Sequence, residues 1–217
     1  MEWRLLTDVP PDDIRELLSI ARRRTFSKGE VVVHAGDPAD SLHLIVEGRF
    51  AVRVMTRLGE TALLAVHGPG DAFGELALVS PGAQRSATVS ALEAGETRSV
   101  YRDDFARLQA RHPSVNSVLV ALLAEQVRRA NDRIVEAHYV DADARVLRRL
   151  LELEALYGDG SGRATIPLTQ EELAEMAGTS RATVNRVLRD EQRRGTLELR
   201  RGRTIVLDLT GLERRAR

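Results

Sequence analysis

Residues 168–208 read LTQEELAEMAGTSRATVNRVLRDEQRRGTLELRRGRTIVLD and contain the signals for two short helices followed by a hairpin. Thr169 stands three residues before Glu172, which is the spacing of a capping box at a helix start. Gly178 supplies a tight turn after the first helix, and Ser180 can cap the second. Two short helices joined by a turn that contains glycine predict a helix-turn-helix.

The two predicted helices each have an apolar face. The inward residues are Leu173, Ala174, Met176 and Ala177 in the first helix, and Val184, Val187 and Leu188 in the second. The residues expected to project outward from the second helix are Arg181, Ala182, Asn185, Arg186 and Arg189. The segment LELRRGRTIVLD is typical of a hairpin that turns at Arg201-Gly202, a wing able to contact phosphates.

The charge of this region favours a polyanionic partner. Between residues 178 and 203 the chain has eight arginines against three acidic residues, a net of +5, although the whole chain has a net charge of zero. A small three-helix module for protein interaction is the alternative interpretation. Double-stranded DNA is favoured, because phosphate neutralisation needs this charge and base reading needs forked donors.

N-terminal to this region, residues 112–138 predict one long helix. Its apolar residues alternate at spacings of four and three, which marks a narrow seam: Val120, Leu123, Val127, Ala130, Ile134 and Ala137. The helix could pack on its own domain, but a stripe this narrow favours a partner helix and hence a homodimer. The segment YVDADAR, residues 139–145, is predicted to be a hinge. Asp141 or Asp143 can cap the next helix, which ends at Gly158.

The first half of the chain has a different periodicity. Residues 10–22 predict a short helix. From Phe26 to about Arg98, short β-branched runs alternate with glycine-rich turns, a pattern typical of an antiparallel barrel or roll. The predicted fold is therefore α+β: a β-roll domain (1–111), a dimerisation helix and hinge (112–140), and a winged helix-turn-helix (141–217).

With this order of elements, the chain resembles the CRP/FNR family of bacterial transcription regulators over nearly its full length. FGELALVSPGAQRSATVSA, residues 73–91, is similar to the family's phosphate-binding cassette, and GTSRATVNRVL resembles its recognition helix. The resemblance implies a cytoplasmic homodimer that binds a near-palindromic DNA site and works with RNA polymerase. It also implies a cyclic nucleotide, cyclic AMP above all, as the effector.

For the cassette, the resemblance implies a role for each end. Arg85 would bind the cyclic phosphate together with the Ser86 hydroxyl, and Glu75 would accept from the ribose 2′-OH. The candidate ligand-binding residues are Gly74, Glu75, Leu76, Arg85, Ser86, Ala87 and Asn131. The alternative is an internal Glu75–Arg85 salt bridge with no ligand.

For the helix-turn-helix, the candidate DNA-binding residues are Thr169, Ser180, Arg181, Ala182, Thr183, Asn185, Arg186, Arg189 and Arg201. The family pattern Arg-Glu-Thr-Val-x-Arg has Ala182 in place of its Glu. We therefore expect the half-site to resemble TGTGA but to be relaxed or changed at the base pair that the Glu reads.

The long helix departs from the cyclic-AMP-responsive members. Gln126 stands where they have an Arg and Ala130 where they have a Thr, while Asn131 keeps a polar neighbour. Another cyclic nucleotide, a weaker affinity for cyclic AMP and ligand-independent DNA binding all stay open at this point. Ligand at the cassette is expected to reach the seam at Asn131 and to bias the hinge at 139–143.

Other functions have less support in the sequence. The absence of cysteine excludes disulfides, zinc–thiolate sites and cysteine-ligated iron–sulfur clusters. The histidines form no cluster at metal-ligand spacing, so no metal is expected, and haem binding through His67 is a remote alternative. Asp71, Glu75 and Ser80 do not form a nucleophile–base arrangement, so the chain is not expected to be an enzyme. No apolar run reaches the roughly 20 residues that span a bilayer, and the N-terminus lacks a secretory signal. A cyclic-nucleotide-binding module that acts on a protein partner is the remaining rival.

Overall fold

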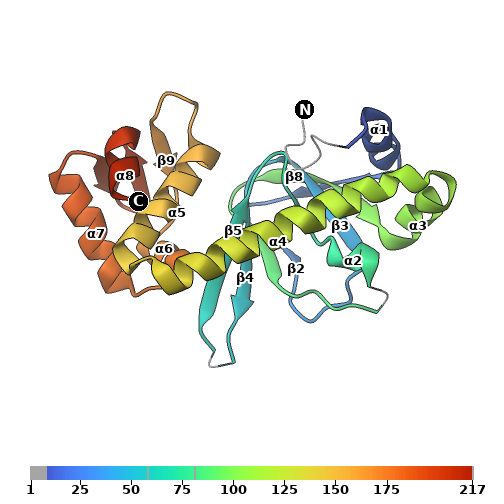
Figure 1. Ribbon diagram of the computed structural model, residues 1–217, viewed down its shortest axis with the longest axis horizontal. Coiled ribbons are helices and arrows are strands. Elements are labelled where there is room, and N and C mark those ends of the chain that lie inside the picture. The colour runs from blue at the N-terminus through green and yellow to red at the C-terminus, as the bar shows by residue number, and fades with distance from the viewer. Residues whose placement is uncertain (1–8, 58, 81, 217) are drawn as a thin grey trace. The chain divides into compact units, whose positions relative to one another are not determined.

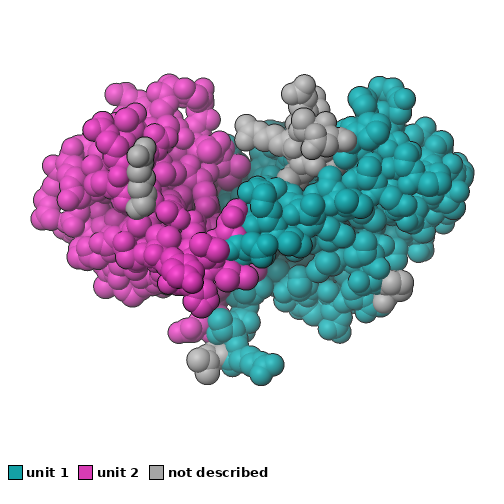
Figure 2. Space-filling model, viewed as in Figure 1, with its two compact units in different colours: residues 1–59, 65–131 teal, residues 60–64, 132–217 magenta. Residues whose placement is uncertain are grey.

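The computed structural model describes residues 9–57, 59–80 and 82–216. Backbone contacts divide the chain into two compact units (Figure 2). The first consists of Met1–Gly59 and Ala65–Asn131, and the second of Glu60–Leu64 and Asp132–Arg217. The division falls inside the long helix, between Asn131 and Asp132. Within the second unit, Glu136 near the end of that helix pairs with Arg149 at 2.5 Å.

Two antiparallel sheets form the first half of the chain. Their strands are β1 (Arg22–Phe26), β2 (Val31–Val33), β3 (Ser41–Glu47), β4 (Phe50–Met55), β5 (Thr61–His67), β6 (Ala72–Phe73), β7 (Thr88–Ala91) and β8 (Gly95–Tyr101). One sheet has the order β1-β8-β3-β6 and the other β2-β7-β4-β5. β8 pairs antiparallel with β1 and β3, and β7 pairs antiparallel with β2 and β4.

Side chains from both sheets form the core between them. This cluster contains Phe26, Ile45, Phe50, Phe73, Val89 and Ala91. Strand β3 has the period-two alternation that such a layer requires. Ile45 belongs to the core between the sheets, whereas Leu42 and Leu44 belong to a second cluster.

Helices cover this second cluster. They are α1 (Pro11–Ile20), α3 (Arg102–Arg111), a 3₁₀ turn (Pro113–Val115) and the N-terminal half of α4 (Asn116–Tyr139) (Figure 1). The buried helical residues that meet Leu42 and Leu44 are Leu17, Phe105, Leu108, Val115, Val118, Leu119 and Leu122. The short helix α2 (Leu76–Val79) lies within the cassette.

The second unit contains the helix-turn-helix. Its elements are α5 (Ala142–Tyr157), β9 (Ala164–Ile166), α6 (Gln170–Ala177), α7 (Arg181–Arg193), β10 (Leu197–Arg200), β11 (Arg203–Val206) and α8 (Leu209–Arg215). The hairpin β10–β11 is joined by β9 in a three-stranded sheet of order β10-β11-β9. Asp141 caps α5 by accepting from Ala144 N at 2.9 Å, so the first of the two proposed caps is confirmed. The helix ends before Gly158, as expected.

The predicted fold class is confirmed, with corrections at several elements. α1 ends at Ile20, so Arg22 begins a strand instead of ending a helix. The long helix begins at Asn116, because the chain around Pro113 forms a separate 3₁₀ turn. The elements that were not predicted include α3, which buries only Phe105 and Leu108, and the three-residue strand β9.

Within the described residues, no helix is both long enough and apolar enough to cross a membrane.

Candidate functional sites

The cassette brings Gly74 and Arg85 into direct contact. Gly74 follows β6 with φ +85°, a region that favours glycine. A Cβ atom at this position would lie 2.6 Å from Arg85 Nη1 and 2.8 Å from the Ser41 carbonyl oxygen. No larger residue therefore fits at Gly74 without moving the arginine. Glu75 comes next and precedes the first turn of α2, which begins at Leu76.

Arg85 is buried, with 7% of its surface exposed. Its Nη1 donates to the Ser41 carbonyl at 2.7 Å, and its Nη2 donates to Ser41 Oγ at 2.9 Å and to Asp40 Oδ1 at 3.1 Å. Burial lowers the pKa of the guanidinium, while Asp40 and the nearby Glu75 oppose that shift. The guanidinium is thus held on one edge by a carboxylate and a backbone carbonyl.

The carboxylate that pairs with Arg85 is Asp40 rather than Glu75. No ion pair among the described residues joins Glu75 to Arg85, so the internal bridge considered from the sequence is not formed. Asp40 and Ser41 precede Arg85 by more than 40 residues, and no local pattern marks them as its partners. Arg102 is another residue of this region that the sequence did not indicate. Its Nε donates a hydrogen bond to the Ala77 carbonyl at 2.5 Å, and a terminal nitrogen donates one to the Ala39 carbonyl. It therefore ties α2 to the segment before Asp40.

The other cassette residues differ in accessibility. Ser86 is exposed and Ala87 is buried, while Leu76 and Glu75 are half-buried.

Asn131 is exposed on α4. It lines an open apolar groove together with Val120, Leu123, Ala124, Val127 and Arg128. Val120 is 66% exposed and Val127 60%, so the predicted seam is uncovered on the single chain.

His43 connects Arg85 to the core between the sheets. Its ring is stacked on Phe73 with centroids 4.9 Å apart, and Ser41 Oγ lies 3.4 Å from its Nε2. Thr97 and Ser99 place hydroxyl oxygens 3.1 Å from its Nδ1. Burial, assisted by the charge of Arg85, lowers the pKa of His43 from 6.5 to about 3. The imidazole is therefore neutral at physiological pH.

His43 should make the fold sensitive to mild acid. The unfolded chain protonates this side chain near its ordinary pKa of 6.5, whereas the folded chain resists protonation down to about pH 3. The stabilising contribution is complete above pH 6.5 and is lost as the pH falls towards 3. We expect the free energy of unfolding to drop by about 1.4 kcal/mol between pH 7.5 and 5.5 from this residue alone. Urea unfolding of the wild type and of His43→Gln at several pH values measures the free energy of unfolding. The variant should lack this part of the pH dependence. If the free energy falls equally with pH in both proteins, the assignment is contradicted.

His67, the residue considered for haem, lies beside a carboxylate. Its Nδ1 is 3.7 Å from Asp71 Oδ2. Asp71 also lies 3.4 Å from Arg129 Nη2, and Arg129 Nε in turn lies 2.6 Å from Glu125 Oε1. Across the described part of the chain, no group of three or more histidines and carboxylates is arranged to hold a metal ion.

In the second unit, the capping signals act as the sequence predicts. Thr169 and Glu172 form a complete capping box at the start of α6, and Gly178 ends this helix in the left-handed conformation. Ser180 accepts from Thr183 N at 3.1 Å at the start of α7. Leu173, Val184 and Leu188, predicted to face inward, are buried.

The outer face of α7 presents most of the predicted residues. Arg181, Ala182, Arg186 and Arg189 are exposed, as is Arg201 between β10 and β11. Thr183 and Asn185 are half-buried. Asn185 Nδ2 donates to Gln170 Oε1 at 2.9 Å, and its Oδ1 accepts from Arg189 Nε at 3.0 Å. Asn185 therefore positions Arg189 instead of projecting freely.

Arg186 has a partner that sequence reasoning did not identify. Asp143, in the first turn of α5, binds its guanidinium with both carboxylate oxygens. Close by, Arg145 donates to the carbonyls of Ala177 and Gly178, which fixes the turn between α6 and α7 to α5.

Comparisons with known proteins agree with this arrangement. The family models of the cyclic nucleotide-binding domain and of the Crp-like helix-turn-helix domain match residues 23–112 and 144–215. The chain is 34% identical over 212 residues to a CRP-like cAMP-activated global transcriptional regulator of Mycobacterium tuberculosis, covering 96% of this chain and 94% of that protein. It is 33% identical over 209 residues to a cyclic AMP receptor protein of Thermus thermophilus, with the same coverage of 96% and 94%.

A solved structure shows the same architecture. A CRP/FNR-family transcriptional regulator from Thermus thermophilus superposes with a TM-score of 0.76 at 26% identity, covering 90% of this chain and 98% of that one. The resemblance of the two sequence motifs is thus matched by likeness over nearly the whole chain. On this evidence, the chain belongs to the CRP/FNR family of DNA-binding transcription regulators.

Proposed function

We propose that the chain acts as a homodimer that binds a near-palindromic DNA site and is controlled by a cyclic nucleotide bound at Arg85. The observation that carries the effector half of this proposal is the buried guanidinium of Arg85, held against Gly74. A single cyclic phosphate carries one negative charge, which a guanidinium can bind through two donors. A binding role, rather than a catalytic one, agrees with the relatives named as transcriptional regulators.

The ligand contacts follow from the residues around this arginine. Arg85 and Ser86 bind the phosphate, and Glu75 accepts from the ribose 2′-OH. Gly74 and Ala87 allow close approach of the backbone, and Leu76 adds an apolar contact. Asn131, on the rim of the α4 groove, contacts the base.

Cyclic AMP is the effector we propose, because the relative from Mycobacterium tuberculosis is named as activated by it. Ala130 lacks the hydroxyl that the resemblance associates with base contact on this helix. We expect weaker discrimination between cyclic AMP and cyclic GMP as a result, and calorimetric titration with both nucleotides measures this difference.

A second candidate is ligand-independent DNA binding. It is favoured by one observation: Arg85 already has Asp40 and Ser41 as hydrogen-bond partners. The same titration separates the two candidates. Heat from neither nucleotide, together with DNA binding unchanged by both, would establish the ligand-independent form.

For DNA recognition, Arg181 and Arg186 are proposed to read guanines in the major groove, and Arg189 and Arg201 to contact phosphates. Thr169 caps α6 and Ser180 caps α7. Both residues therefore lie at helix N-termini, which can face DNA phosphates. RNA polymerase is the proposed protein partner of the bound dimer.

Binding to DNA should depend steeply on salt. A protein that neutralises DNA phosphates releases counterions. The logarithm of its affinity therefore falls linearly with the logarithm of the salt concentration, and each phosphate contact adds about −0.9 to the slope. Mobility-shift titrations at two salt concentrations, with and without cyclic AMP, measure this slope. A flat response would contradict a DNA-reading role and favour a module that acts on a protein partner.

Ala182 should relax the specificity of the half-site. An alanine methyl group cannot accept from a cytosine amino group, so one base pair of a TGTGA-like half-site loses about 1–3 kcal/mol of discrimination. Selection from random duplexes should return a half-site degenerate or altered at that pair, and Ala182→Glu should restore the preference. Recovery of an unaltered, strongly constrained TGTGA by the wild type would be inconsistent with this prediction.

A further inference from the structure

The guanidinium of Arg186 is engaged within the protein. Its Nη1 donates to Asp143 Oδ2 at 2.8 Å, and its Nη2 donates to Asp143 Oδ1 at 2.5 Å. This is a bidentate pair, the geometry in which arginine binds carboxylates most specifically. The side chains remain 55% and 46% exposed, so a larger anionic ligand can reach the same atoms.

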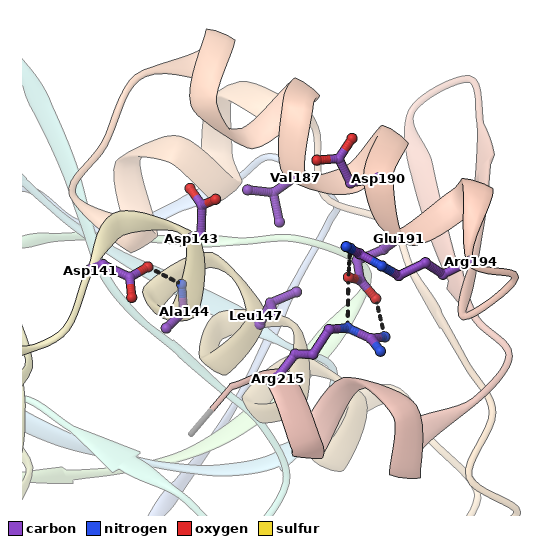
Figure 3. A pocket seen from close by; sticks show the side chains of 9 residues that line it. All are labelled: Asp141, Asp143, Ala144, Leu147, Val187, Asp190, Glu191, Arg194 and Arg215. Atoms are coloured by element: carbon purple, nitrogen blue, oxygen red, sulfur yellow. Dashed lines mark hydrogen bonds and ion pairs between the residues drawn. The ribbon is translucent and has the colours of Figure 1, made fainter.

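Asp143 approaches α7 from the segment that follows the long helix. α4 ends at Tyr139, and Asp143 is the second residue of α5. Asp143 lines a cavity of about 460 Å³ together with Val187 and Asp190 of α7. Figure 3 shows these three side chains.

The other three carboxylates that line this cavity have different partners. Asp141 caps α5 at Ala144 N, and Asp190 pairs with Arg193. Glu191 pairs with Arg194 and Arg215 (Figure 3). Of these four acids, Asp143 is the one bound to an arginine proposed to read DNA.

The atoms of Arg186 that Asp143 binds show whether this carboxylate hinders or supports base reading by the arginine. Asp143 takes one N–H from each terminal nitrogen of Arg186, which are the donors that guanine O6 and N7 would use in an end-on contact. A residue that supports base reading would leave that end of the fork available.

Resting on the proposed function, we infer that Asp143 is an internal competitor of DNA for Arg186. In the free protein the Asp143 carboxylate is paired with the Arg186 guanidinium. For Arg186 to bind a guanine, this ion pair must first break. Asp143 thereby lowers the affinity for DNA.

The test is a comparison of Asp143→Asn with the wild type. The full-length variant keeps the size of the side chain and loses its charge. The DNA is a duplex that the wild type selects from random sequences. Fluorescence anisotropy at fixed salt measures the affinity of both proteins for this duplex. An exposed ion pair of this kind corresponds to about threefold to fivefold in affinity for each reader. A dimer that uses two readers should gain about tenfold to 25-fold.

Two matched variants isolate the pair. Asp190→Asn removes a charge from the same cavity but leaves the pair of Arg186 intact, so its gain should be under about twofold. In the Arg186→Gln background, Asp143→Asn should change DNA affinity little, because the competitor then has nothing to release.

Each outcome decides the inference. Specific binding by the wild type with no gain, or a loss, in Asp143→Asn overturns it and leaves the proposed function standing. A gain that persists in the Arg186→Gln background also overturns it, since charge repulsion alone would explain the effect. If neither wild type nor variant binds DNA at any salt concentration, the proposed function fails and the inference fails with it.

Discussion

Replacement of Arg85 by glutamine is expected to weaken cyclic nucleotide binding at least about thirtyfold. The guanidinium is the buried cation of the cassette, and its removal leaves the ligand phosphate without a charged donor. Loss of one partner from a buried, hydrogen-bonded charge pair costs roughly 2–5 kcal/mol. Calorimetric titration with cyclic AMP measures the change in dissociation constant directly. If the effector controls DNA binding, the variant should also lose its response to cyclic AMP in mobility shifts.

Two controls separate ligand binding from folding. Arg85→Lys keeps the positive charge but loses the fork that reaches both Ser41 and Asp40, so it should bind with intermediate affinity. Asp40→Asn leaves the guanidinium in place and removes its present carboxylate partner, so binding should be retained or strengthened. Thermal unfolding of each variant shows whether the roll is intact. Cyclic AMP binding by Arg85→Gln at wild-type affinity would remove Arg85 from the site.

The features predicted well from sequence are those with local causes. Thr169 and Glu172 are three residues apart, and a capping box depends on nothing outside that turn. Gly178 adopts positive φ because of its own backbone freedom. The fold class followed from local patterns for the same reason, since the β-branched runs cut by glycine-rich turns and the seam of α4 recur over many neighbouring residues.

The features that sequence reasoning missed depend on distant residues. Arg85 meets Asp40 and Ser41 only because the roll brings together segments separated by more than 40 positions. Asp143 and Arg186 are equally far apart, and neither residue has a local signal for the other. Helix α3 was missed for a different reason: only Phe105 and Leu108 are buried, too few for a clear period. The local geometry of a motif could thus be predicted from its own residues, whereas partners from distant segments could not.

A charge placed on the exposed apolar seam of α4 is expected to have a second large effect, on the assembly of the dimer. Ile134 lies on this seam and is 56% exposed on the single chain. Ile134→Glu is expected to convert the proposed homodimer into monomers, because such a dimer loses two buried isoleucines, worth about 1.5–3 kcal/mol apiece, and gains two facing carboxylates. The dimer dissociation constant should rise at least about a hundredfold, a shift that analytical ultracentrifugation resolves. Affinity for a palindromic DNA site should fall with it, since a monomer engages one half-site.

Val135 offers a control matched in exposure. It is the next residue of α4, also 56% exposed, but it lies off the stripe that contains Val127 and Ile134. Val135→Glu adds the same charge to the same helix, yet it should leave the dimer and its DNA affinity nearly unchanged. The buried residues of α4 are Val118, Leu119 and Leu122, in its N-terminal half, so neither substitution disturbs the roll. Equal dissociation by both glutamates would mean that general repulsion, and not the seam, determines assembly; dimers in both would place the interface elsewhere on the chain.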